Sequence, residues 1–324
     1  MNIEFKKETF KLKKVFTISR GSKVNAEVIT ISISKNGFIG YGECIPYKRY
    51  NETIDSVINQ IETVKKIDNR DEINTFLPAG AARNAIDCAM WDLEAKILNS
   101  SVFEISSLPK PKPKPVTSAF TLSLSSPSEM AKEAGLNASK SILKIKLGGG
   151  IKDIERIEAI KASAPYSKII VDANESWSVD DFLKIEPIFY KLGVKMIEQP
   201  FLSKEDYHLI NIKKNIPICA DESCHTSSDL ANCINKYDII NIKLDKTGGL
   251  SEAIKLKKQA LQLNFDIMIG CMVGTSLSIA PALLLTDDAK WIDLDGPLLL
   301  KNDREYPLVY KNDNIFPASK KLWG

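Results

Sequence analysis

The feature that most constrains the fold is a series of eight short, apolar and β-branched runs in the second part of the chain, which begin roughly 22 to 27 residues apart. One such interval accommodates a strand, a helix and two short loops. Helical periodicity between the runs, as in SEAIKLKKQALQL, supports this repeat. The predicted strands cover residues 116–122, 142–147, 169–171, 194–197, 216–219, 239–244, 265–269 and 291–294.

Eight strands that alternate with helices predict a closed (β/α)8 barrel. The alternative is an open, doubly wound sheet, which usually carries a glycine-rich phosphate-binding turn after its first strand. No such turn stands in that context, so the barrel is favoured. Gly296-Pro297 directly follows the last run, so we do not expect a full eighth helix.

A second domain is expected before the barrel. Residues 26–34 and 38–43 are strand-like and flank Asn36-Gly37, a pair typical of tight hairpin turns. Residues 81–98 have the spacing of an amphipathic helix that packs on this sheet. The alternating prolines of residues 109–115 favour an extended spacer. We therefore predict an α+β domain over residues 1–112, completed by a returning tail of residues 300–324, and a barrel over residues 113–299.

Composition narrows the function classes. The chain has 44% hydrophobic and 26% charged residues, as globular proteins do, and its formal net charge of +3 argues against a nucleic acid partner. No apolar run approaches the roughly 20 residues of a membrane span, so no membrane partner is expected. The six cysteines lack a C-x-x-C motif, and the lysine-rich N-terminus is unlike a signal peptide. Together these features indicate a cytoplasmic protein.

Three successive predicted strands each end in one carboxylate: Asp172, Glu198 and Asp221. In a barrel the carboxyl ends of the strands form the catalytic rim, and converging carboxylates suit Mg²⁺. The alternative is that each acid caps a helix or forms a surface ion pair. One acid on each of three consecutive strands, without His or Cys nearby, favours the metal site.

Lysines flank these acids at the predicted rim. Lys144 and Lys146 share one face of the second strand, and Lys243 lies on the sixth strand, across the barrel. Repulsion between neighbouring ammonium groups, together with a divalent cation, would favour the uncharged amine that a base requires. The alternative is that these lysines are solvated or in ion pairs. Lys246 is predicted to lie on the other side of the pleat, at the surface.

The motifs resemble those of the enolase superfamily, muconate lactonizing subgroup, and within it the dipeptide epimerases. The segments 41–53 and AIDCAMWDLEAK are similar to parts of that family's capping domain. The motifs that carry the resemblance are K-x-K at Lys144 and Lys146, VDAN at Asp172, EQP at Glu198, DES at Asp221, NIK at Lys243 and DLD at Asp293 and Asp295.

The resemblance implies a (β/α)7β barrel with an α+β capping domain. It implies that Asp172, Glu198 and Asp221 ligate Mg²⁺ and that Lys146 and Lys243 are the paired acid and base. Family members often assemble as symmetric oligomers, so a homo-oligomer is expected as well. The residues implied in substrate binding are Lys144 for the carboxylate, Asp293 and Asp295 for an α-ammonium, Thr121, Cys271 and Val273 along the wall, and Arg20 for a side-chain carboxylate.

The resemblance thus implies a Mg²⁺-dependent epimerase of dipeptides, and Arg20 would favour L-Ala-D/L-Glu. Arg20 could equally be a surface residue, and Asp293 and Asp295 could cap a turn. One alternative is o-succinylbenzoate synthesis or muconate cycloisomerisation, which needs no ammonium-binding pair. Another is a barrel that binds a partner without catalysis.

Overall fold

The computed structural model describes residues 1–64, 67, 69–106, 108 and 114–324. The N-terminal part forms an antiparallel sheet in the order β1-β2-β3, with β1 at Asn2–Ile18, β2 at Gly21–Lys35 and β3 at Phe38–Cys44. Asn36 and Gly37 have φ angles of 53° and 81°, so they form the predicted hairpin turn. Residues 109–113 of the predicted proline spacer lie outside the described residues.

Four α-helices follow the sheet within the described residues: α1 at Ile54–Thr63, α2 at Ile73–Phe76, α3 at Ala81–Ile97 and α4 at Val102–Ile105. The central helix α3 packs so closely on β3 that a Cβ atom at Gly42 would lie 2.1 Å from the carbonyl oxygen of Ala85. Its other side faces the barrel, where Arg83 donates to the carbonyls of Thr247 and Gly248. The expected amphipathic helix is therefore buried on nearly every side.

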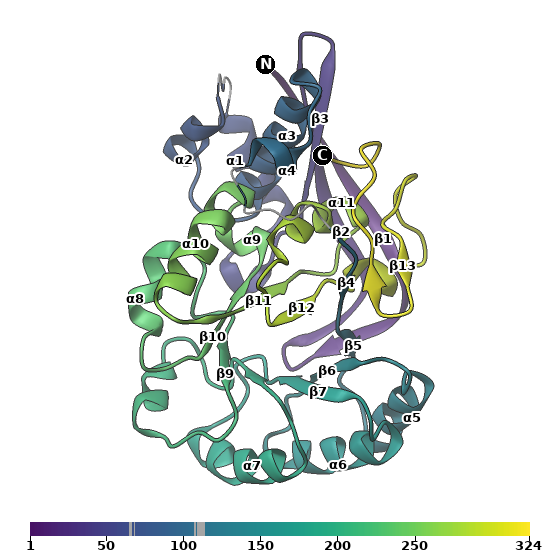
Figure 1. The fold of residues 1–324 in the computed structure, drawn as a ribbon, viewed down its shortest axis with the longest axis vertical. Coiled ribbons are helices and arrows are strands. Elements are labelled where there is room, and N and C mark those ends of the chain that lie inside the picture. The colour runs from purple at the N-terminus through teal and green to yellow at the C-terminus, as the bar shows by residue number, and fades with distance from the viewer. Residues whose placement is uncertain (65–66, 68, 107, 109–113) are drawn as a thin grey trace.

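Eight parallel strands form the second sheet, in the order β12-β11-β10-β9-β8-β7-β6-β5 (Figure 1). Hydrogen bonds from the amide of Ala119 to Ile292 O (2.8 Å) and from the amide of Leu294 to Ser118 Oγ (3.0 Å) join its two ends. The sheet is therefore a barrel and not an open sheet. The strands are β5 at Phe120–Leu122, β6 at Ile142–Lys146, β7 at Lys168–Asp172, β8 at Ile197–Glu198, β9 at Ile218–Ala220, β10 at Ile239–Ile242, β11 at Asp266–Gly270 and β12 at Trp291–Asp293.

The first predicted barrel strand, residues 116–122, is in fact two strands in different sheets. β4, at Val116–Thr117, pairs with β14 at Asn314–Ile315, which in turn pairs with β13 at Tyr310–Lys311. Only β5 enters the barrel. The local pattern could not reveal this division, because the partner of β4 comes from the far end of the chain.

The connections between barrel strands are less regular than the repeat predicts. Four long helices are α5 at Pro127–Leu136, α6 at Asp153–Ser163, α7 at Val179–Lys191 and α10 at Leu250–Gln262. Three short helices are α8 at Leu230–Cys233, α9 at Leu244–Thr247 and α11 at Ser276–Ile279. The connection from β8 to β9 contains only a 3₁₀ helix at Asp206–Asn211. A 3₁₀ turn at Gly296–Leu299 follows β12, where no full helix was expected.

The C-terminal tail contacts both parts of the molecule (Figure 1). The indole of Trp323 donates to the carbonyl of Cys88 in α3 (3.0 Å), and the amide of Lys301 donates to the carbonyl of Lys11 in β1 (2.8 Å). The hydroxyl of Tyr310 donates to the carbonyl of Leu294 beside the barrel (2.8 Å). Within the described residues, no helix combines the length and the apolar character that crossing a membrane requires.

Candidate active site

The carboxyl ends of the barrel strands bring most of the predicted site residues to one rim. Lys146 of β6 stands beside Asp172 of β7, which stands beside Glu198 of β8. Burial is high throughout this set, because none of its members exposes more than 9% of its surface. The set comprises Lys144, Lys146, Asp172, Glu198, Asp221, Lys243, Asp293 and Asp295.

Lys144 lies at the floor of the rim, among carboxylates. Its Nζ atom is 2.6 Å from Asp293 Oδ2, 2.6 Å from Glu198 Oε2 and 3.6 Å from Asp172 Oδ2. Burial acts to lower the pKa of Lys144, but the carboxylates of Asp293, Glu198 and Asp172 raise that pKa well above its ordinary value. The attraction of these carboxylates therefore outweighs any repulsion from Lys146 at this position.

The two other rim lysines each pair with a different acid. Lys146 Nζ is 2.6 Å from Asp172 Oδ2, and Lys243 Nζ is 2.6 Å from Asp221 Oδ2. Their strands, β6 and β10, are four strands apart in the eight-stranded barrel, so the two amines face each other across it. Burial acts to lower the pKa of Lys243, but Asp221 and Glu198 raise it above its ordinary value.

The three carboxylates fit a divalent cation by their negative charge and by their oxygen donors. Burial acts to raise the pKa of Asp172, but Lys146, Lys144 and Lys243 lower it to about 2, so the group is anionic at neutral pH. Glu198 Oε2 and Asp221 Oδ1 are buried, and each forms an ion pair, with Lys144 at 2.6 Å and with Lys246 at 2.8 Å. Lysine ammonium groups stand between the acids, so no three potential ligands of the described chain converge on one point. The donor set is nevertheless one of hard oxygen ligands that suits Mg²⁺.

A cavity of about 960 Å³ opens above this rim, between the barrel and the β1–β2 hairpin. Asp293 and Asp295 border it from the end of the last barrel strand. Asp295 Oδ2 accepts a hydrogen bond from the amide of Thr121 (2.6 Å), and Asp293 Oδ1 accepts one from the Thr121 hydroxyl (3.2 Å). The wall also contains Thr121, Cys271, Val273 and Arg20, whereas Lys144, the other residue predicted to bind the substrate, is not among its lining residues.

Arg20 reaches the cavity, but the barrel already holds its guanidinium. Its Nη atoms donate to Glu222 Oε1 (2.7 Å), to the carbonyl of Asn174 (2.8 Å), to the hydroxyl of Tyr47 (2.9 Å) and to Glu175 Oε2 (3.3 Å). Four of its five N–H donors are thus engaged. Glu175 and Glu222 were not among the predicted site residues, although Glu175 directly follows the VDAN motif and Glu222 stands within the DES motif.

The surface assignment of Lys246 is wrong. Its side chain is fully buried, and its Nζ atom lies 2.8 Å from Asp221 Oδ1. Lys243 is the residue before α9, and Lys246 lies within that helical turn. Two residues three apart in a helical turn lie on the same side, whereas in a continuing strand they would face opposite sides.

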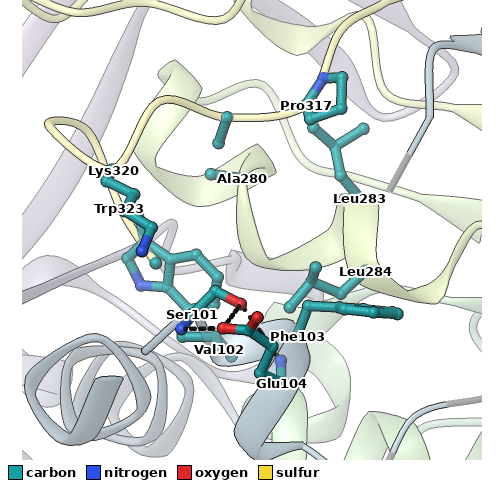
Figure 2. A pocket seen from close by; sticks show the side chains of 12 residues that line it. Ser101, Val102, Phe103, Glu104, Ala280, Leu283, Leu284, Pro317, Lys320 and Trp323 are labelled. Carbon is teal, nitrogen blue, oxygen red and sulfur yellow. Dashed lines mark hydrogen bonds between the residues drawn. The ribbon is translucent and has the colours of Figure 1, made fainter. Parts of the chain in front are cut away.

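A second, smaller cavity of about 300 Å³ lies between α4, the segment after α11 and the C-terminal tail (Figure 2). Its walls are mainly apolar, with Leu283, Leu284 and Trp323 among them. Glu104 borders this cavity, but its carboxylate accepts hydrogen bonds from the amide and hydroxyl of Ser101 and so caps α4. The chemistry-bearing groups therefore gather at the larger cavity.

Fold and site together define a class: a barrel enzyme whose rim sets lysines against three carboxylates and whose mouth is covered by an α+β domain. Residues 2–105 match the mandelate racemase / muconate lactonizing enzyme N-terminal domain, and residues 128–299 match the enolase C-terminal domain-like family. The chain belongs to the mandelate racemase / muconate lactonizing enzyme family of the enolase superfamily.

Two characterised relatives extend over almost the whole chain. An N-acetyl-D-glutamate racemase of Pseudoalteromonas sp. is 44% identical over 307 residues, covering 92% of this chain and 95% of the relative. The L-Ala-D/L-Glu epimerase of Escherichia coli (strain K12) is 41% identical over 304 residues, covering 92% of this chain and 94% of the relative. Both relatives are named for a substrate that contains glutamate.

Solved structures agree with the fold closely. An enolase family member from Agrobacterium tumefaciens with homology to dipeptide epimerases, with sodium and L-Ala-L-Glu bound, is 43% identical and superposes with a TM-score of 0.96 over 99% of both chains. The dipeptide epimerase of Enterococcus faecalis V583, complexed with Mg and L-Leu-L-Tyr, is 27% identical, with a TM-score of 0.90 over 98% of this chain and 96% of that one.

Proposed function

We propose that the chain is a Mg²⁺-dependent epimerase that inverts the α-carbon of the C-terminal residue of a dipeptide, with L-Ala-D/L-Glu as its substrate. The observation that carries the proposal is the placement of Lys146 and Lys243 at one cavity, on strands that face each other across the barrel. Two amines on opposite sides of one carbon are what a reversible inversion needs, because one removes a proton and the other delivers one.

Asp172, Glu198 and Asp221 would hold the Mg²⁺ ion, since all three are buried carboxylates at the ends of neighbouring barrel strands. When bound, Mg²⁺ stabilises the negative charge that develops on the substrate carboxylate as the α-proton leaves. Lys144, with its ammonium between Glu198 and Asp293, would donate to that same carboxylate.

In one direction Lys146, as the neutral amine, takes the α-proton, and Lys243, as the ammonium, gives a proton to the opposite face. The reverse reaction exchanges these two roles. Asp172 and Asp221 hold the two Nζ atoms in place through their 2.6 Å contacts. An acid that ligates a cation stabilises its ammonium partner less, so loading the site would favour the neutral amine that the base requires.

Asp293 and Asp295 would bind the N-terminal ammonium of the dipeptide through charge-assisted hydrogen bonds. Support comes from their position on the cavity wall and from the anchoring of Asp295 by the amide of Thr121. Cys271 and Val273 would line the same site. Arg20 would meet the side-chain carboxylate through its remaining donor or by exchanging one of its present partners.

A second candidate is the racemisation of N-acetylglutamate, which the relative at 44% identity favours. Its proton chemistry would use the same metal ligands and lysines. An N-acetyl group carries no positive charge, so this substrate would gain nothing from two acids at the amine end. The pair of Asp293 and Asp295 therefore favours the dipeptide.

The assay is proton NMR in D₂O with Mg²⁺ and L-Ala-L-Glu, in parallel with N-acetyl-L-glutamate. We expect the glutamyl α-proton of the dipeptide to exchange as the second diastereomer forms. EDTA should abolish both changes, and Lys146→Met should abolish formation of the second diastereomer. Lys152→Met, at an exposed lysine outside the cavity, is the matched control and should keep full activity. If the α-proton exchanges in neither compound, and in no member of a wider set of dipeptides, the proposed function is refuted.

We also propose a cytoplasmic location and a domain division into residues 1–112 with 300–324 and residues 113–299. The described cysteines are all free thiols, as is usual in a reducing compartment. The two family matches, which end at residue 105 and begin at residue 128, support a boundary between them. Assembly into a homo-oligomer is proposed from the family and is testable by light scattering.

A further inference from the structure

Lys246 is an ammonium group buried against four oxygen atoms. Its Nζ atom lies 2.6 Å from the carbonyl oxygen of Asp221, 2.8 Å from the carboxylate oxygen Oδ1 of the same residue, and 2.9 Å from the carbonyls of Cys224 and Asn241. The side chain is 0% exposed, and it is not part of the cavity wall. All four of these contacts are to protein oxygens, and two of them belong to a proposed metal ligand.

These contacts divide the Asp221 carboxylate between two lysines. Lys243 takes Oδ2 from the cavity side, at 2.6 Å, and Lys246 takes Oδ1 from the interior. The interior contact leaves Asp221 no freedom to rotate about its side-chain bonds without breaking an ion pair whose lysine side chain is 0% exposed. A buried charge that loses its partner is costly, so the fixed orientation is strongly preferred.

Lys246 also fixes the backbone that carries Asp221. It joins the end of β9, the loop at Cys224 and the end of β10 at Asn241. Asn241 in turn donates to Glu198 Oε1 at 2.7 Å, so the same connection reaches a second proposed ligand. One ammonium thus ties together the two strand ends that supply Asp221 and Lys243.

We propose that Lys246 is a positioning residue for the metal site: it holds the carboxylate of Asp221 in the orientation that binds the cation and keeps that acid within reach of Lys243. This inference rests on the metal site of the proposed function. Partners that orient metal ligands typically change affinity by 10- to 100-fold when removed.

The test is the binding of Mg²⁺ to the purified full chain by isothermal titration calorimetry, with circular dichroism to verify the fold. Lys246→Met keeps the apolar stem and removes the ammonium. We expect it to weaken Mg²⁺ binding at least about tenfold. Lys257→Met is the matched control. Lys257 lies on α10, is also largely buried, and donates a hydrogen bond to the backbone carbonyl of Asp287. The control should bind Mg²⁺ within about twofold of the wild type.

Wild-type affinity in a folded Lys246→Met variant would overturn the inference. If that variant does not fold, Lys246→Gln, which keeps hydrogen-bond donors without the charge, is titrated in its place and has the same refuting outcome. If neither variant folds while Lys257→Met does, Lys246 serves the fold and not the metal site, which also overturns the inference. Failure of the wild type to bind Mg²⁺ would instead refute the metal site itself, and the NMR assay tests the reaction separately.

Discussion

Replacing Asp295 by asparagine tests whether the carboxylate at the end of the last barrel strand binds a positively charged group of the substrate. Asparagine has nearly the same shape, and its amide oxygen can still accept the hydrogen bond that Asp295 Oδ2 receives from the amide of Thr121 at 2.6 Å. What the substitution removes is the charge. A hydrogen bond to a charged group contributes about 1.5–3 kcal/mol, and each 1.4 kcal/mol is tenfold. We therefore expect kcat/KM for L-Ala-L-Glu to fall roughly 10- to 150-fold.

The pH dependence of kcat/KM provides a second test of the same role of Asp295. Burial and the neighbouring carboxylate of Asp293 raise the pKa of Asp295 from 3.8 to about 7. The group is therefore largely protonated below pH 7 and ionised above it, and only the ionised form attracts an ammonium strongly. The advantage of the wild type over Asp295→Asn on the dipeptide should accordingly grow as the pH rises from about 6 to 8.

The assay compares the glutamyl α-proton exchange of L-Ala-L-Glu with that of N-acetyl-L-glutamate, for wild type and variant at several pH values. N-acetyl-L-glutamate has no ammonium group, so its exchange should change by less than about threefold on substitution. An equal loss of exchange rate for both compounds would show that Asp295 supports the fold of the site and does not bind the ammonium group. An undiminished rate on the dipeptide would refute the ammonium-binding role outright.

Three further outcomes are expected. Lys146→Met and Lys243→Met should each abolish epimerisation, by 10²-fold or more, while each keeps α-proton exchange for only one of the two epimers, as NMR from either epimer will show. Removal of Mg²⁺ by EDTA should stop turnover and lower the Tm, and added Mg²⁺ should restore both, as thermal unfolding will report. Glu8→Gln should destabilise the protein by about 1 kcal/mol at pH 7 and hardly at all near pH 2. Burial acts to raise the pKa of Glu8, but Thr30, Arg304 and Lys6 lower that pKa from 4.5 to about 2. The folded state thus keeps this carboxylate ionised down to lower pH than the unfolded state does, and the stabilisation is lost as the pH falls from about 4.5 towards 2; urea unfolding at several pH values measures it.

The rim of the site was predictable because it depends on local patterns. An apolar run that ends in Asp172, Glu198 or Asp221 specifies both a strand and the residue at its carboxyl end, and the barrel brings such ends together whatever the loops do. The first barrel strand was not predictable to the same degree. Residues 116–122 are one run in the sequence but lie in two sheets, because the returning tail pairs with β4.

Lys246 was missed for a different reason. Its assignment to the surface followed from extending the strand past residue 242, whereas the chain turns into α9 at Leu244. That turn changes which residues share a side, and so it moves Lys246 from the surface to the interior beneath Asp221. Boundaries of short elements depend on tertiary contacts, in this case on the hydrogen bonds that Lys246 donates to the carbonyl oxygens of Asp221 and Cys224.

The ion pairs at the mouth of the cavity join the domain that covers the substrate to the strands that carry the chemistry. Glu175, which has a left-handed φ of 63°, accepts two 2.6 Å hydrogen bonds from Arg49, and Glu222 accepts a 2.7 Å hydrogen bond from Arg20. A strained backbone persists where its surroundings fix it, and here two arginines of the N-terminal domain do so. Glu222 directly follows Asp221, so the hairpin that carries Arg20 is tied to the segment of a proposed metal ligand. The N-terminal domain therefore forms a structural part of the rim through Arg20, the same side chain that was expected to select the substrate.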